Sequence, residues 1–220
     1  MKFSALAFDL NGTLYPNYRL YMRLVPFLMR NQRLLRAMDR ARTMLRKSGE
    51  YGADFYDTQA ILMAGALKKP ASKIKEQTER LIYRGWEPFF KKIELFPHVR
   101  ETLDSFRSLG IKMGLLSDFP AENKLENLNI SGYWDAVICS EQAGRLKPDP
   151  KPFLDLARAM NKLPKDMLYV GNSVPFDVVG AARAGMKTAL ILPRWKKRPS
   201  SAALDFVFHD YRQLHDYVLS

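Results

Sequence analysis

The sequence predicts an α/β protein in which helices cover both faces of a parallel sheet and an all-helical segment is inserted near the N-terminus. Two patterns indicate this fold class. After Pro97, short apolar runs that are typical of strands alternate with amphipathic helical runs, as in βαβ units. Between about Asn17 and Phe90, Arg recurs with Leu or Met at helical spacing and β-branched residues are scarce, which predicts helices and no strand.

In chain order, the first element is a short buried strand over residues 3–9, FSALAFD, which ends in a turn at Asn11 and Gly12. The all-helical segment follows, and its proline and glycine residues divide it into four or five helices. Beyond it we expect strands over residues 111–117, 135–140, 167–172, 187–193 and 206–209, with helices over residues 98–110, 121–129, 150–161, 175–185 and 211–219.

The composition is that of an ordinary globular protein, and 220 residues are enough for one domain that carries an insertion. The formal net charge of +12 fits an anionic small substrate, a nucleic acid or a membrane surface as partner. Cys139 is the only cysteine, so neither a disulfide nor a cysteine metal cluster can form within the chain. No run reaches the roughly 20 apolar residues of a membrane span, and the N-terminal apolar stretch is too short for a signal peptide, so we expect a cytoplasmic protein.

Polar residues stand at four of the predicted strand ends. Ligands of parallel α/β sheets bind at the carboxyl ends of the strands, so these residues are candidates for one shared site. Taken singly, each could be an ordinary turn or cap residue. The candidates are Asp9 and Thr13 in DLNGT, Ser117 and Asp118 in GLLSD, Lys147 in GRLKPDPKPF, and Asn172 with Asp177 in YVGNSVPFDVVGAARAG.

With these four motifs in this order, the sequence resembles the haloacid dehalogenase-like hydrolases over nearly the whole chain. The family's sequence motifs are closely matched by the stretches FPHVRETLDSFRSLGIKMGLLSD, KPDPKPF and GAARAGMKT. The resemblance implies a Rossmann-like hydrolase core made of residues 1–15 and 93–220. It also implies a helical cap over residues 16–92, which closes over the site and determines the choice of substrate.

The resemblance further implies how the site works. Asp9 would be the nucleophile and would form a covalent aspartyl intermediate. Thr13 and Ser117 would donate hydrogen bonds to the transferred group, with Asp118 as a nearby extra acid. Lys147 would place a positive charge against both the nucleophile and an anionic substrate.

A magnesium ion would be held by Asp9 and by the backbone carbonyl of residue 11. In phosphatases of the family a further acid stands at the position of Asn172, and here Asp177 could reach the metal directly or through water. An amide oxygen can still coordinate the metal but supplies no charge. We therefore expect a weak magnesium site.

Asn11 is the other departure from the phosphatase pattern. The residue at this position is normally an aspartate that protonates the leaving alcohol and then activates the hydrolytic water. An amide can do neither, and the loss of such a group typically costs roughly 10²–10⁴ in rate. The sequence therefore predicts a slow phosphatase that acts on a small phosphorylated metabolite.

Two alternatives stay open. A metal-independent 2-haloacid dehalogenase also lacks the second acid, because halide leaves without a proton, but the tyrosine that typically follows the nucleophile of that branch is absent here. A catalytically impaired member could instead serve as a basic binding module, since residues 17–47 carry eight Arg and one Lys against the single acid Asp39. A solvated helical face is the preferred explanation of this charge. No nucleic-acid motif accompanies it, so a nucleic-acid partner is not expected, and the oligomeric state is not predicted.

Overall fold

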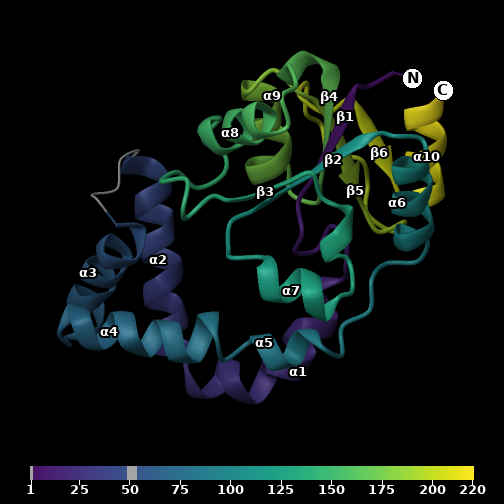
Figure 1. Ribbon diagram of the computed structural model, residues 1–220. Helices are drawn as coiled ribbons and strands as arrows, with labels where there is room; N and C mark the ends of the chain where they lie inside the picture. The colour runs from purple at the N-terminus through teal and green to yellow at the C-terminus, as the bar shows by residue number, and fades with distance from the viewer. Residues whose placement is uncertain (1, 49–53) are drawn as a thin grey trace.

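Six parallel strands form one sheet in the computed structural model, which describes residues 2–48 and 54–220 (Figure 1). Their order across the sheet is β3-β2-β1-β4-β5-β6, and every neighbouring pair is parallel. This sheet confirms the α/β, Rossmann-like fold that the sequence predicts. The strands are β1 (Ala5–Phe8), β2 (Lys112–Ser117), β3 (Ala136–Cys139), β4 (Met167–Gly171), β5 (Lys187–Ile191) and β6 (Phe206–Phe208).

Strand β1 lies at the centre of the sheet. It pairs with β2 on one side and with β4 on the other, so Phe8 is opposite both Leu115 and Val170. Its four residues are completely buried, as expected for a parallel strand that is covered on both faces. The strand order changes direction at β1, and α/β sheets bind their ligands at such a point. Asp9, the residue after β1, therefore stands where a site is expected.

Four helices cover the two faces of the sheet, namely α6 (Val99–Ser108), α8 (Lys151–Ala159), α9 (Val179–Arg183) and α10 (Tyr211–Leu219). Alternate residues of β1 face opposite layers, because side chains alternate along a strand. Leu6 and Phe8 belong to the larger apolar core under α6 and α10. Ala5 and Ala7 face α8 and α9, where their small side chains leave room for Phe153 of α8. Figure 1 shows the two layers on opposite sides of the sheet.

The helix predicted over residues 175–185 is divided in two. Its first part, Val174–Val178, is a π-helical turn in which the Ser173 carbonyl accepts hydrogen bonds from the amides of Asp177 (2.9 Å) and Val178 (3.1 Å). The carboxylate of Asp177 accepts from the amides of Asn172 and Ser173, which stabilises this wider turn. Such π-helical turns often occur at functional sites, and this one directs Asp177 towards the end of β4.

Between β1 and α6 the residues that the structure describes form helices joined by turns and no strand of the sheet, as the sequence predicts. We call residues 17–90 the helical insert. Part of its apolar core is formed by Met38, Met63 and Ile82. Within the described ranges, no helix is both long and apolar enough to cross a membrane. The insert comprises α1 (Asn17–Arg30), α2 (Gln32–Ser48), α3 (Phe55–Leu67), α4 (Ala71–Thr78), the π-helical turn Glu79–Tyr83 and α5 (Glu87–Phe90).

A buried arginine joins the insert to the sheet. The guanidinium of Arg42, on α2, forms an ion pair with Glu141, which follows β3, and lies 4.2 Å from the centre of the Phe119 ring. The hydroxyl of Tyr83 donates a hydrogen bond of 3.1 Å to the same carboxylate. The cationic stretch is therefore not a solvated face throughout. Its exposed members are Arg23, Arg30, Arg33, Arg36, Arg40 and Lys47.

Loss of the Arg42 charge should destabilise the fold. Arg42→Met keeps an apolar stem but leaves the buried Glu141 carboxylate without its cation, so the free energy of unfolding should fall by about 3 kcal/mol or more. Urea unfolding at pH 7 measures the difference. Arg40→Met, on the exposed side of the same helix, is the control and should change stability by less than about 0.5 kcal/mol.

Adding Glu141→Gln to Arg42→Met should restore part of the stability, since it removes the unpaired charge. Equal stability of the natural protein and Arg42→Met would show that this ion pair does not hold the insert.

Candidate active site

The ammonium of Lys147 lies between two carboxylates at the carboxyl edge of the sheet. Its Nζ is 2.7 Å from Asp9 Oδ1 and 2.7 Å from Asp177 Oδ1. The three residues are nearly inaccessible to solvent, with 4%, 5% and 2% exposure for Lys147, Asp9 and Asp177. The Lys147 ammonium also donates a 3.4 Å hydrogen bond to the hydroxyl of Tyr169. Residues from three of the four predicted strand ends therefore meet at one buried cation.

The turn after β1 brings a hydroxyl to the second oxygen of Asp9. Thr13 Oγ1 donates a hydrogen bond of 2.7 Å to Asp9 Oδ2 and lies 3.4 Å from Asn172 Oδ1. Gly12 has φ +84°, and a Cβ at this position would collide with the side-chain amide of Asn172. Only glycine adopts this conformation readily and leaves room for the amide. The turn therefore requires Gly12 if Thr13 and Asn172 are to approach Asp9.

Two backbone amides fix the carboxylate of Asp177. Its Oδ2 accepts hydrogen bonds from the amides of Asn172 (3.1 Å) and Ser173 (3.0 Å), while Oδ1 faces Lys147. A Cβ at Gly171 would collide with the Asp177 side chain, so the end of β4 is shaped to admit it. All the oxygens of both carboxylates thus have a hydrogen-bond donor.

The buried surroundings of Asp9, the candidate nucleophile, raise its pKa. Burial raises the pKa of Asp9 to about 6, and the nearby Asp177 acts in the same direction, while Lys147 and Thr13 oppose the rise. Asp9 is therefore ionised at pH 7 and takes up a proton as the pH falls through about 6. An ionised carboxylate beside an ammonium is the arrangement that nucleophilic attack by Asp9 requires.

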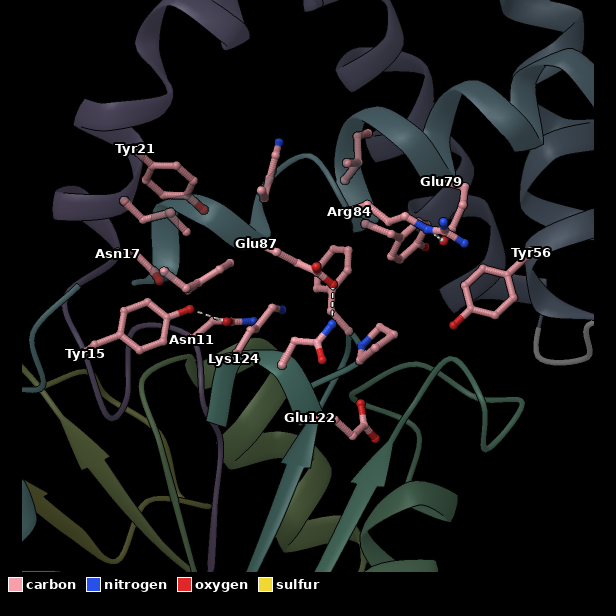
Figure 2. Close-up of a pocket in the computed structure, with 18 residues that line it drawn as sticks. Asn11, Tyr15, Asn17, Tyr21, Tyr56, Glu79, Arg84, Glu87, Glu122 and Lys124 are labelled. Atoms are coloured by element: carbon pink, nitrogen blue, oxygen red, sulfur yellow. Dashed lines mark hydrogen bonds and ion pairs between the residues drawn. The ribbon is translucent and has the colours of Figure 1, made fainter. Parts of the chain in front are cut away.

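Asn11 faces a cavity of about 520 Å³ between the insert and the sheet (Figure 2). Its Oδ1 accepts a hydrogen bond from the hydroxyl of the buried Tyr15. Tyr15 was not among the residues predicted from the sequence, although an aromatic residue two positions after the DLNGT motif was a usable signal. Aromatic residues form much of the cavity wall, namely Tyr15, Tyr21, Tyr56, Tyr83, Trp86, Phe90 and Phe119.

The fourth strand end, after β2, lies beside this cluster. Ser117 is buried and its Oγ accepts a hydrogen bond from the Phe119 amide (3.2 Å). Asp118 accepts from the Lys147 amide (3.2 Å) and forms ion pairs with Arg46 (2.8 Å) and Arg42 (3.5 Å). Burial alone would raise the pKa of Asp118, but the cations around it hold the pKa below its usual range. Contacts of Ser117 and Asp118 with a substrate stay predictions.

Arg46 connects the insert to the loop of Lys147. Its Nε donates a 2.9 Å hydrogen bond to the Lys147 carbonyl, and its guanidinium lies 4.6 Å from the centre of the Phe176 ring. The sequence marks Arg42 and Arg46 only as members of a cationic run, so their place beside the site could not be singled out.

Comparison with known proteins identifies the family. A family model for haloacid dehalogenase-like hydrolases matches residues 3–185. This chain belongs to the haloacid dehalogenase-like hydrolases. The resemblance predicted from the four motifs is therefore confirmed.

Two phosphatases of known activity are similar in sequence to this hydrolase. The glyceraldehyde 3-phosphate phosphatase of Methanopyrus kandleri is 29% identical over 202 residues, which cover 85% of this chain and 83% of that protein. The phosphoglycolate phosphatase of Salmonella typhimurium is 30% identical over 118 residues, or 50% of this chain and 46% of that enzyme. The second match therefore spans about half of each protein.

Solved structures of the family share the fold. A 2-haloacid dehalogenase from Pseudomonas syringae has a TM-score of 0.69 at 21% identity, over 98% of this chain and 97% of that one. A phosphatase of the family from Thermococcus onnurineus has a TM-score of 0.63 at 22% identity, over 99% and 98% of the two chains. At these identities the likeness concerns the fold alone.

Phosphatases of this family generally use magnesium, so the oxygen donors near Asp9 are of interest. Asp9 Oδ2 and Asn172 Oδ1 converge on the hydroxyl of Thr13, and carboxylate and amide oxygens are suitable magnesium ligands. Among the described residues, no group of three or more His, Cys, Asp or Glu side chains could hold a metal. Asp9 and Asn172 therefore fit a magnesium ion only if phosphate oxygens and water supply its remaining ligands.

Neutralising Asp9 should stabilise the fold above pH 6. The pKa of Asp9 is raised from 3.8 to about 6, so the folded state binds the proton more tightly than the unfolded state, and the ionised form carries a cost above about pH 6. Asp9→Asn should therefore raise the free energy of unfolding at pH 7.5 by on the order of 1–3 kcal/mol, and the gain should shrink towards pH 5.

Urea unfolding with EDTA at both pH values measures this gain. Asp39→Asn, at an exposed acid of α2, is the control and should give no such pH-dependent gain. A lower free energy of unfolding for Asp9→Asn than for the natural protein at pH 7.5 would contradict the inference that the ionised Asp9 carboxylate destabilises the fold.

Proposed function

We propose that this hydrolase is a slow phosphatase of small phosphorylated metabolites with Asp9 as its nucleophile. The observation that carries the proposal is the buried ammonium of Lys147, which pairs with Asp9 at the position where α/β sheets bind ligands. The similarity to phosphatases of glyceraldehyde 3-phosphate and of phosphoglycolate supports a small phosphorylated substrate.

In the first step, a carboxylate oxygen of Asp9 attacks phosphorus and the bond from phosphorus to the alcohol oxygen breaks. In the second step, water attacks the phosphorus of the aspartyl phosphate, which releases inorganic phosphate and restores the carboxylate. Lys147 offsets part of the negative charge of Asp9 and of the phosphoryl oxygens in both steps. The hydroxyls of Thr13 and Ser117 would donate hydrogen bonds to those oxygens.

The proposed steps lack a general acid and base for proton transfer. The leaving alcohol needs a proton and the attacking water must lose one, and Asn11 stands where an acid would serve both needs. Its Oδ1 already accepts the Tyr15 hydroxyl, and a carboxamide neither donates nor accepts a proton at neutral pH. Both transfers then depend on solvent, which typically costs roughly 10²–10⁴ in rate.

Magnesium would be held by Asp9, by the backbone carbonyl of residue 11 and by the amide oxygen of Asn172. When bound, the ion would supply positive charge to the phosphoryl oxygens. Asp177 Oδ2 accepts two backbone amide hydrogen bonds and Oδ1 accepts the Lys147 ammonium, so Asp177 would contact the ion through water. Among the described residues, Asp9 Oδ2 accepts only the Thr13 hydroxyl, which leaves a lone pair for the ion. With a single carboxylate as direct ligand, the affinity for magnesium is low.

The helical insert would act as the cap of the enzyme, with a core of residues 1–15 and 93–220 and a cap of residues 16–92. Support for this division comes from the cavity, whose walls include Tyr56 and Tyr83 of the insert and Phe119 and Lys124 of the core. The leaving group would occupy this cavity, so the cap would select the substrate.

A metal-independent 2-haloacid dehalogenase is the second candidate. The observation in its favour is that Lys147 and Thr13 donate hydrogen bonds to both oxygens of Asp9, and a halide leaves without a proton, so Asn11 would be no obstacle. In that reaction Asp9 would displace the halide from carbon, and water would hydrolyse the resulting ester. The sequence relatives favour the phosphatase.

Restoring the two acids should raise the phosphatase rate. Asn11→Asp with Asn172→Asp should increase magnesium-dependent hydrolysis of p-nitrophenyl phosphate by roughly 10², on the scale of one general acid/base. Asp9→Asn added to this variant should abolish turnover. Asn172→Asp alone should tighten magnesium binding, measured by calorimetry, more than it raises the rate, because it adds charge but no proton donor.

A variant that changes the exposed Asn129 and Asn161 to Asp controls for added charge and should leave the rate unchanged. Rapid hydrolysis of p-nitrophenyl phosphate by the natural protein would contradict the proposal that Asn11 makes the reaction slow. Halide release from 2-chloropropionate without magnesium would favour the dehalogenase, and inactivity of every variant towards both substrates would favour a binding module.

A further inference from the structure

The cavity beside Asn11 contains a lysine that the proposed chemistry does not use. Lys124 belongs to α7 (Glu122–Asn127), the helix that follows β2, and is one of the cavity-lining residues (Figure 2). Its Nζ lies 5.3 Å from the centre of the Phe90 ring and 5.2 Å from that of Phe119. The aromatic rings stabilise the cation but supply no counter-charge.

The acids that line the same cavity have other partners. Glu79 pairs with Arg84 at 2.9 Å, Glu87 accepts a hydrogen bond from Asn123, and Glu122 accepts one from the Ala121 amide at 3.0 Å. The ammonium of Lys124 forms neither an ion pair nor a hydrogen bond with any residue that the structure describes. The cavity therefore presents one unpaired positive charge to a ligand.

Desolvation makes this charge costly in the absence of a ligand. Burial lowers the pKa of Lys124 to about 8, and the acids further away, Glu141 and Asp9, only partly oppose this. Lys124 is still mostly protonated at pH 7, so it is a cation that lacks both full hydration and a counter-ion. A bound anion would relieve this cost, which favours anionic ligands at this position.

We infer that Lys124 binds a carboxylate on the leaving group of the substrate, so that the preferred substrates are phosphate monoesters of small hydroxy acids. This inference rests on the proposed phosphatase activity and adds the substrate class. Asn11 lines the same cavity, so a leaving group between Asp9 and Lys124 would have its phosphoryl end at one residue and its carboxylate at the other. A single ammonium matches one carboxylate, and the aromatic walls reduce competition from water.

Matched pairs of substrates test the inference. Phosphate monoesters of two-, three- and four-carbon hydroxy acids are compared with ethyl, propyl and butyl phosphate, and phosphate release is measured at pH 7. The natural protein should prefer the hydroxy-acid esters. Lys124→Met should lower kcat/KM for them by about tenfold or more, mainly through KM, and change that for the alkyl phosphates by less than about twofold.

Lys124→Arg, which keeps the charge, should retain most of the preference. Lys91→Met, at an exposed lysine outside the cavity, is the control and should behave like the natural protein. An equal effect of Lys124→Met on both substrate series, or no effect on either, would overturn the assignment. Tighter binding of propane-1,3-diyl bisphosphate than of the three-carbon hydroxy-acid ester would overturn the choice of a carboxylate.

The two proposals can fail separately. If no phosphate ester of either series is hydrolysed in an Asp9-dependent way, the proposed function fails. Binding of the hydroxy-acid esters to Asp9→Asn, measured by calorimetry, then tests Lys124 alone. Adding Lys124→Met must weaken this binding about tenfold or more if the assignment is right, and unchanged affinity would overturn it.

Discussion

The ion cluster at Lys147 is the interaction on which the rest of the site depends. Lys147 lies between Asp9 and Asp177, so a single ammonium joins the chain segments that follow β1, precede α8 and follow β4. Two buried carboxylates would repel each other without this cation. Local features of the backbone serve the same cluster, since Gly12 and Gly171 leave the space that neighbouring side chains need. Burial, together with the negative charge of Asp177, explains why the pKa of Asp9 is raised.

A second charge network couples the insert to this cluster. Arg46 donates to the carbonyl of Lys147 and pairs with Asp118, while Arg42 pairs with Glu141. The position of the insert and the position of the Lys147 loop are therefore linked through side chains of α2. Two cations of α2 are used in these contacts. The exposed arginines of α1 and α2 have no assigned role.

The sequence was informative wherever parallel strands decide the geometry. The carboxyl ends of β1, β3 and β4 must lie along one edge of the sheet, so the meeting of Asp9, Lys147 and Asp177 could be foreseen from motif order. The strands are shorter than predicted, as for Ala5–Phe8 within residues 3–9, because hydrophobic patterning does not mark where pairing stops. Contacts of the insert, such as Arg42 with Glu141, depend on helix packing over long sequence distances and could not be read from spacing. The same holds for Lys124, whose importance lies in having no partner acid.

A structure of the protein with beryllium fluoride, a mimic of a transferred phosphoryl group, would show whether Asp9 is the nucleophile. We expect the beryllium fluoride on a carboxylate oxygen of Asp9, within hydrogen-bond distance of Lys147 and of the hydroxyls of Thr13 and Ser117. Electron density for beryllium fluoride at another residue, or an unmodified Asp9 at saturating beryllium fluoride and magnesium, would contradict the role of Asp9 as nucleophile.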